Sequence, residues 1–365
     1  MIENLKKRAT GAEFDIFPII TLCALDIICE TAMGTGVGAQ SNSESDYVKA
    51  VYKASEFLAH RFYRPWLHND AIYNMTKPGK AFTECLQILH DFTEKVIRER
   101  KTELDKVLED HTEFDLNDLS KFKESRDAIS HDARKGRKKR LAFLDMLLYA
   151  SKGDPSLDFQ GIREEVDTFM FEGHDTTAAG ISWAIYLIGA HPEVQAKLQR
   201  EMDALFGNDN KPVSMEDINA MHYLDHVIKE ALRVFPSVPI IGRHITEECI
   251  IAGYQIPKGT QAVIVPYAIH RDAEHFPDPE KFDPDRWLPE QAAKRHPYCY
   301  VPFSAGLRNC IGQKFAMMEE KVLLSSILRN FHITSCQTRE ELNPMGELIM
   351  RPRDGIRVKL TLRNS

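Results

Sequence analysis

The sequence of 365 residues lacks several features that would assign it to particular classes of protein. Its seven cysteines are odd in number and show no CxxC spacing, so they do not indicate a disulfide framework. No Gly/Ser-rich or Pro-rich linker and no internal repeat divides the chain. The net charge of −7 provides no excess of positive charge, which argues against a general nucleic-acid binder.

The sequence also has no apolar run long enough to cross a bilayer. The most apolar early stretch, residues 16–28, carries Pro18 and Asp26 and is too short to span, so we expect a core helix there. With 43% hydrophobic and 28% charged residues the composition is that of a globular protein with ample core. We therefore expect a single domain over residues 1–365.

Apolar periodicity predicts a mainly α chain with minor β structure. Pro192 suits the first turn of a helix, and Ser214 with Asp217 forms a plausible capping box. A polar stretch, residues 113–140, ends in a basic run and is typical of a solvated loop. Helical spacing covers residues 42–60, 78–110, 159–190, 221–234 and 313–328, and short β runs cover 250–251, 254–256 and 262–265.

The most informative segment is FSAGLRNCIG, residues 303–312, in which one cysteine lies in a turn between glycines. Gly306 and Gly312 lack a Cβ, so the backbone can bend tightly and approach a flat ligand closely. A Cys310 thiolate presented in this way suits a haem iron, because thiolate ligation favours cleavage of an O–O bond. Arg308 can offer its guanidinium to a haem propionate. The alternative is a buried structural cysteine, which the register of Phe303, both glycines and Arg308 makes less attractive.

A second group of polar residues lies within the predicted helix 159–190. Glu172, Asp175 and Thr176 are three and four residues apart, so we expect them to project from one face. An acid and a hydroxyl there could relay protons to a bound oxygen, and Gly173 would leave a gap in the helix wall for a ligand or water. The alternative is a solvent-facing polar patch, which the bulky apolar residues around the segment disfavour.

A third group combines charges from two segments. Glu230 and Arg233 place opposite charges at i and i+3 on an apolar helix, which alone is a weak signal. The proline-rich segment 276–287 is stiff and can hold Arg286 in a fixed place. The apolar stretch 237–241 that follows the helix suits a hydrocarbon-binding cavity wall.

The segment with Cys310 resembles the cysteine loop of cytochromes P450, the haem-thiolate monooxygenases, and residues 14–34 and 169–177 are similar to family 4 and its insect members. The resemblance implies the cytochrome P450 fold, with Glu230, Arg233 and Arg286 as a structural triad that supports the cysteine loop. It implies the following roles at the cofactor: Cys310 as iron ligand, Phe303, Gly306 and Gly312 around it, Arg308 and Arg243 at the haem propionates, Thr176 and Asp175 in oxygen activation, and Glu172 esterified to a haem methyl.

The resemblance further implies insertion of one oxygen atom from O2 into a C–H bond of a lipophilic substrate, with fatty-acid hydroxylation near the terminal carbon. Electrons would come from NADPH through a separate flavoprotein reductase that docks near Lys314. The cytosolic face of the endoplasmic reticulum membrane is the expected location. Family members carry an anchor, a β-rich lobe and early helices before such a sequence, so we expect a chain truncated at its N-terminus.

Three other interpretations remain open at this point. The chain could be an inactive or haem-binding-only fragment of such an enzyme. It could be a haem-thiolate isomerase or lyase, although Asp175 and Thr176 would have little use there. A haem-binding sensor without turnover is the third.

Overall fold

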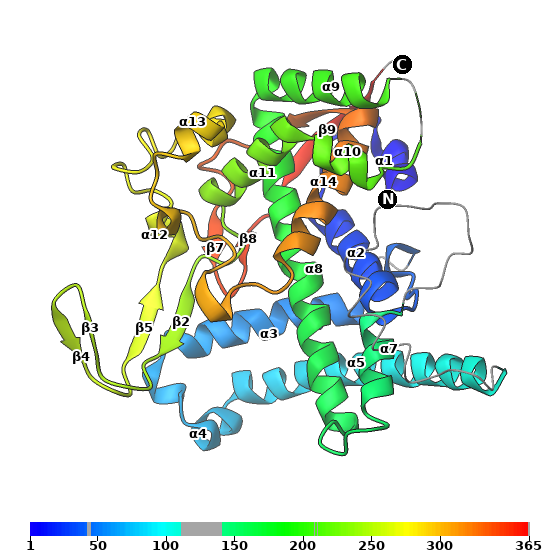
Figure 1. Cartoon of the computed structure of the whole chain (residues 1–365), viewed down its shortest axis with the longest axis vertical. Coiled ribbons are helices and arrows are strands. Elements are labelled where there is room, and N and C mark those ends of the chain that lie inside the picture. Colours follow the sequence, from blue (N-terminus) through cyan, green and yellow to red (C-terminus); the bar gives the residue numbers. More distant parts are fainter. Residues whose placement is uncertain (42–44, 111–140, 208, 210, 364–365) are drawn as a thin grey trace.

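The long helix α8 (Phe159–Ala190) runs through the middle of the molecule, with other helices lying around it (Figure 1). The computed structural model describes residues 1–41, 45–110, 141–207, 209 and 211–363. Within these ranges helices predominate and the strands are short, which confirms the mainly α class with minor β structure. The solvated loop predicted over residues 113–140 lies wholly outside the described residues.

The central position of α8 follows from its composition. Asp158 caps its first turn, because the side chain accepts a hydrogen bond from the Gly161 N–H at 2.8 Å. Every residue from 177 to 189 is buried, so the second half is apolar on all sides and requires neighbours all round. The helix ends before α9 (Pro192–Phe206), where the predicted proline occupies the first turn.

Two hydrophobic cores share α8. The larger core joins the second half of α8 to α2 (Phe17–Ile28), α9, α11 (His222–Val234) and α14 (Gln313–Asn330). The smaller core joins the first half of α8 and α2 to α3 (Asp46–Phe62), α5 (Lys77–Asp110) and α7 (Phe143–Ala150). The segment of α8 with the predicted oxygen-activating residues lies where the two cores meet.

The strands form small antiparallel groups. In one sheet β9 (Arg357–Leu362) lies between β1 (Phe14–Asp15) and β6 (Phe331–Ser335). The strand β2 (Ile241–His244) pairs with β5 (Gln261–Ile264), which places Arg243 opposite Ala262. Two further pairs are β3 (Cys249–Ile251) with β4 (Tyr254–Ile256), and β7 (Pro344–Gly346) with β8 (Met350–Pro352).

Most predicted elements lie close to their observed bounds. The helix expected over residues 42–60 begins at Asp46, because Ser45 caps it, and residues 42–44 are outside the described part. The capping box of Ser214 and Asp217 starts α10 (Met215–Ala220), as predicted. In the part of the chain that the structure describes, no helix combines the length and the hydropathy needed to span a membrane. The remaining helices are α1 (Ile2–Arg8), α4 (Asp70–Met75), α12 (Pro266–Ile269) and α13 (Pro289–Ala292), with short helical turns that include η4 (Pro284–Trp287) and η6 (Gly306–Arg308).

Candidate active site

Cys310 lies exposed in the loop between η6 and the start of α14. The loop closes on itself, since the Cys310 N–H donates to the Phe303 carbonyl at 2.9 Å and the Asn309 N–H donates to the Gly306 carbonyl at 3.2 Å. Gly306 has a φ of +77°, a conformation that other residues adopt only with strain. The predicted tight bend therefore occurs at Gly306, whereas Gly312 has an ordinary φ of −85°.

The surroundings of the Cys310 thiol shift its pKa in both directions. Although the residue is exposed, its thiol is partly buried against the loop, and this raises the pKa of Cys310 overall. The Glu172 carboxylate adds to the rise, whereas hydrogen bonds from the backbone N–H groups of Gly312 and Gln313 oppose it. The two N–H groups belong to the start of α14, and helix N-termini stabilise thiolates. The Glu172 carboxylate on α8 thus lies within electrostatic range of the thiol.

The surface around Cys310 is apolar and uncovered. Leu307 is fully exposed and Ile311 is 84% exposed, on either side of the cysteine. Large apolar side chains exposed in this way indicate a surface that binds a ligand or another macromolecule. Among the described residues no group of three or more His, Cys, Asp or Glu side chains could hold a bare metal ion. The exposed Leu307 and Ile311 beside Cys310 fit a flat apolar macrocycle that carries its own metal ligands, to whose metal Cys310 would supply one further ligand.

Two arginines lie at the same loop. Arg243 on β2 donates to the Ser304 hydroxyl at 2.9 Å and to the Gly242 carbonyl at 2.8 Å. Ser304 itself has a φ of +61°, so this contact is made from a strained backbone. Arg308 ends η6 with its side chain exposed. Both guanidinium groups are available to carboxylates of a cofactor bound over Cys310.

Glu172 and Thr176 lie one turn apart on α8, and Glu172 is more exposed than expected from the sequence. Glu172 is exposed, and partial burial of its carboxyl raises its pKa. The Thr176 hydroxyl donates to the Glu172 carbonyl at 2.7 Å, which is the usual contact of a threonine within a helix. The Thr176 carbonyl accepts a hydrogen bond from the Ser237 hydroxyl at 2.8 Å, so the helix is tied to the segment after α11.

Asp175 has a different environment from these two residues. Its side chain is completely buried and forms an ion pair with Arg351 of β8. The Arg351 guanidinium lies over the Tyr52 ring at 4.4 Å and within 3.5 Å of Glu347. The expectation that Asp175 projects together with Glu172 and Thr176 is therefore not met in this structure.

The gap expected at Gly173 is filled. A Cβ at this position would lie 2.7 Å from two side-chain atoms of Ile28 on α2. Gly173 thus allows α2 and α8 to approach closely, and it does not open the helix wall to a ligand. The prediction was wrong because sequence spacing does not reveal which neighbouring helix occupies the space.

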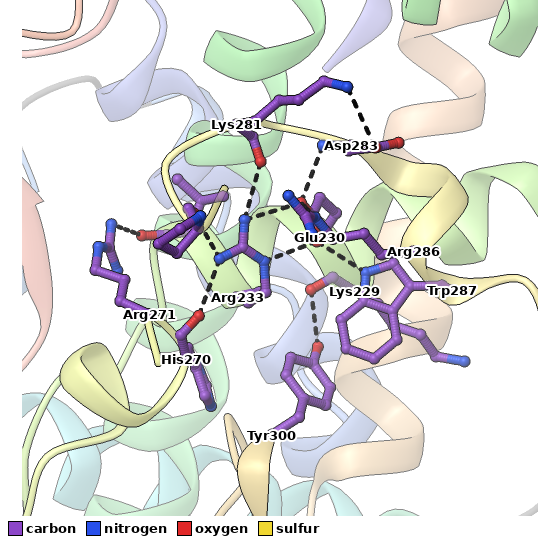
Figure 2. A network of polar contacts seen from close by, with 12 residues as sticks. Lys229, Glu230, Arg233, His270, Arg271, Lys281, Asp283, Arg286, Trp287 and Tyr300 are labelled. Carbon is purple, nitrogen blue, oxygen red and sulfur yellow. Dashed lines mark hydrogen bonds and ion pairs between the residues drawn. The ribbon is translucent and has the colours of Figure 1, made fainter. Parts of the chain in front are cut away.

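The charges of Glu230, Arg233 and Arg286 meet in one cluster (Figure 2). Arg233 and Glu230 are completely buried and form two hydrogen bonds of 2.9 Å. The Arg286 Nε lies 3.4 Å from a Glu230 carboxylate oxygen. Trp287 adds its Nε1–H to Glu230 at 3.0 Å. The buried Glu230 carboxylate thus has several donors, and such a network of buried polar contacts is rigid.

Sequence reasoning missed the side chains that hold the predicted ones. Arg351, Ser304 and His270 each contact a predicted residue or its loop. Ser237 was expected in a cavity wall, and its hydroxyl instead binds the Thr176 carbonyl. Their partners are far away in sequence, as the separation of 176 residues between Asp175 and Arg351 illustrates. The one available signal was chemical, because a carboxylate in an apolar helix requires a cationic partner.

A mainly α-helical fold that presents an exposed cysteine at the start of α14, with Arg243 bonded to the same loop, fits a haem-thiolate protein. Comparison with known proteins agrees, since the family model described as Cytochrome P450 matches residues 1–360. The chain belongs to the cytochrome P450 family, whose members are haem-dependent monooxygenases.

Individual relatives place it near family 4. The chain is 51% identical over 366 residues to Cytochrome P450 4V2 of Homo sapiens, which covers 100% of this chain and 67% of the relative. It is 50% identical over 356 residues to Cytochrome P450 4c3 of Drosophila melanogaster, with 97% and 65% covered. The chain thus spans about two thirds of the length of these relatives. The predicted resemblance to family 4 and its insect members is confirmed.

Proposed function

We propose that this chain inserts one oxygen atom from O2 into a C–H bond near the end of a fatty acid or similar long-chain lipid. The observation that carries the proposal is the exposed Cys310 at the start of α14, near Glu172 of α8 and flanked by Arg243 and Arg308. When bound, thiolate-ligated haem would supply the oxidising chemistry. The chain is proposed to form one domain that holds this cofactor.

In this proposal Cys310 binds the iron and the two arginines bind the propionates. The half-buried side chains of Val238, Ile240 and Ile241 line the apolar route for the substrate. The Thr176 hydroxyl donates a proton on the α8 side. Asp175 can replenish that proton only when its ion pair with Arg351 opens, because the carboxylate is completely buried.

Glu172 is proposed to tether the cofactor. Its carboxylate oxygen would form a C–O bond to a haem methyl carbon, which loses one C–H hydrogen as a proton and two electrons to the O2-driven oxidation that the enzyme itself supports. The exposed position of Glu172 near Cys310 supports this ester. Denaturing the holoprotein in acid tests it, because a haem that is wholly extractable excludes the bond. Glu172→Gln, in which no ester forms, is the matched control.

Electrons are proposed to come from an NADPH-dependent flavoprotein reductase on the cysteine side. Lys314 is exposed at the start of α14 and borders a cavity of 540 Å³ that Lys229 and Lys321 also line. Lys229 and Lys321 both form ion pairs with Asp225, which lines the same cavity, so the proposed contact with an acidic partner rests on Lys314. Location at the cytosolic face of the endoplasmic reticulum membrane is part of the same proposal.

A reconstituted assay with reductase, NADPH and a fatty acid tests the function. We expect NADPH consumption coupled to a hydroxylated product, and a strongly red-shifted Soret band of the reduced carbon-monoxide complex. Cys310→Ser should abolish the band and the product, with little change in fold because Cys310 is exposed. Consumption without product would favour a haem-binding protein without turnover on this substrate.

A further inference from the structure

One buried histidine connects the charge cluster of Glu230, Arg233 and Arg286 to the cysteine loop. His270 follows α12 and is completely buried. Its backbone carbonyl accepts a hydrogen bond from the Arg233 Nη1 at 2.9 Å. Figure 2 shows this carbonyl directed at Arg233 and the ring directed away from it. The backbone carbonyl of His270 therefore binds Arg233, whereas its ring contacts a different partner.

The ring of His270 accepts a hydrogen bond from the Val301 N–H, with 2.9 Å between Val301 N and His270 Nε2. A backbone N–H only donates, so Nε2 must offer its lone pair and the proton must lie on Nδ1. Burial, together with the nearby charges of Arg233 and Arg271, lowers the pKa of His270 to about 3. The ring is therefore neutral, and the acceptor is present throughout the physiological range.

The orientation of the ring is fixed from the side. The ring centroids of His270 and Tyr300 lie 5.1 Å apart with an interplanar angle of 35°. Tyr300 is itself held, because its hydroxyl donates to the Lys229 carbonyl at 2.9 Å and its ring lies 4.3 Å from that of Trp287. His270 thus cannot turn its acceptor away from Val301 without disturbing this aromatic group.

Val301 begins the segment from which the cysteine loop extends. Its carbonyl accepts the Ser304 N–H at 3.0 Å, and two residues later the Phe303 carbonyl accepts the Cys310 N–H at 2.9 Å. Val301 is itself buried. The hydrogen bond to His270 therefore fixes the base of the loop that presents Cys310.

We propose that His270 is a positioning residue for the axial thiolate, acting through the Val301 N–H and anchored by Arg233. The inference rests on the haem-thiolate assignment under the proposed function. The bond between His270 and Val301 holds the loop so that Cys310 keeps its position against the cofactor. Without this acceptor the Val301 N–H would be buried without a hydrogen-bond partner. The free-energy cost of that unsatisfied donor favours movement of the loop.

His270→Phe tests the role, because it keeps a ring of similar size and loses the acceptor. In the haem-loaded chain, we expect the red-shifted Soret band of the reduced carbon-monoxide complex to be lost about tenfold faster on mild warming, which corresponds to about 1.4 kcal/mol. His270→Gln is the conservative variant, since its Oε1 can reach the place of Nε2. We expect it to restore a rate within about threefold of the wild type, about 0.6 kcal/mol on the same scale.

Two controls separate positioning from general stability. Tyr298→Phe changes an exposed tyrosine close in sequence to the loop and leaves the contact of His270 with Val301, so we expect the wild-type rate. Leu198→Ala opens a cavity in α9, inside the larger core, and lowers the melting temperature without a contact to the loop. Compared at temperatures of equal folded fraction by circular dichroism, Leu198→Ala should keep the band while His270→Phe loses it.

Equal rates in His270→Phe and the wild type would overturn the proposal, as would a His270→Gln variant no better than His270→Phe. Should His270→Phe not fold, amide hydrogen exchange of the wild type decides: we expect the Val301 amide to exchange far more slowly than that of the exposed Leu307, and equal exchange overturns the inference. A wild type without the red-shifted band would instead defeat the haem-thiolate assignment itself.

Discussion

Arg351 and Asp175 form an ion pair whose side chains are 7% and 0% exposed, between the C-terminal hairpin β7–β8 and the central helix α8. Removing one member of such a pair leaves a buried charge without its partner. The pair therefore fixes the position of β8 against α8.

We predict that Arg351→Leu lowers the free energy of unfolding by about 3–5 kcal/mol, because Asp175 would be buried without its cation. Urea denaturation measures the change. The double variant Asp175→Asn with Arg351→Leu should lose less than Arg351→Leu alone. Arg357→Ala is the control, since its pair with Glu13 is exposed and should contribute about 0–1 kcal/mol. Equal losses in the two arginine variants would contradict this view of the buried pair.

The two glycines of the cysteine loop should respond differently to alanine. Gly306→Ala places a side chain at a φ of +77° and should cost about 1–2 kcal/mol in unfolding free energy of the haem-free chain. Gly312→Ala has an ordinary φ and an ordinary 3.8 Å contact with the Cys310 Sγ, so its cost should be within about 0.5 kcal/mol. A larger loss of stability for Gly312→Ala would show that the positive φ at position 306 is not the main reason why this loop requires glycine.

The close approach of α2 and α8 can be tested at Gly173. Gly173→Ala should destabilise the chain by about 1–3 kcal/mol, because its Cβ would overlap the Ile28 side chain. Adding Ile28→Val should recover part of the loss, and a double-mutant cycle from thermal unfolding measures the coupling. Strictly additive effects would mean that the two residues do not compete for the same space.

Stability should depend on pH through a carboxyl on α14. Burial raises the pKa of Glu319 to about 8, from an ordinary value of 4.5. The native state therefore holds a proton that the unfolded state releases between these values, so the free energy of unfolding falls as pH rises through that window. The slope from this group is at most about 1.4 kcal/mol per pH unit.

Glu319→Gln should flatten that slope, because the amide does not titrate. Its neighbour Glu320 is also buried, with a pKa raised by burial and by Glu319, so some slope should remain. Urea denaturation at several pH values between 5 and about 8 provides the measurement. An unchanged slope in Glu319→Gln would show that this carboxyl is ionised in the native protein.

Thr176 is expected to matter for turnover more than for folding. Thr176→Val keeps the branched shape and loses the hydroxyl, and we expect hydroxylation to fall by about 10²-fold. Thr176→Ser keeps the hydroxyl and should retain most of the activity. Product per NADPH consumed, measured in the reconstituted assay, separates lost proton delivery from lost electron supply. Similar yields from both variants would exclude the hydroxyl as proton donor.

The sequence was sufficient where local chemistry decides the structure. Periodicity located α8 from Phe159 to Ala190, and capping chemistry located the start of α10 at Ser214. The cysteine loop was predictable because its glycine and cysteine lie within a few residues of each other. These features depend on neighbours in the chain, which a sequence displays directly.

The sequence was insufficient where tertiary packing decides. Asp175 lies beside Glu172 on the same helix, yet a residue from β8 draws it into a separate buried pair. Gly173 suggested an opening, and Ile28 from α2 occupies it. His270 carried no motif, because its role depends on Arg233 and Val301 arriving from other segments.

Hydrogen bonds of Ser237 join α8 to the hairpin of β8. Its hydroxyl holds the Thr176 carbonyl, and its own carbonyl accepts the Met350 N–H at 2.8 Å, while the Met350 carbonyl accepts from Trp183 at 3.0 Å. The turn of α8 around Thr176 and the hairpin of β8 are thereby coupled into one body. A bound molecule bulky enough to push this hairpin outward would also pull on the stretch of helix that carries the Thr176 hydroxyl, which is proposed above as proton donor. The size of the bound molecule and the placement of that hydroxyl would then be linked.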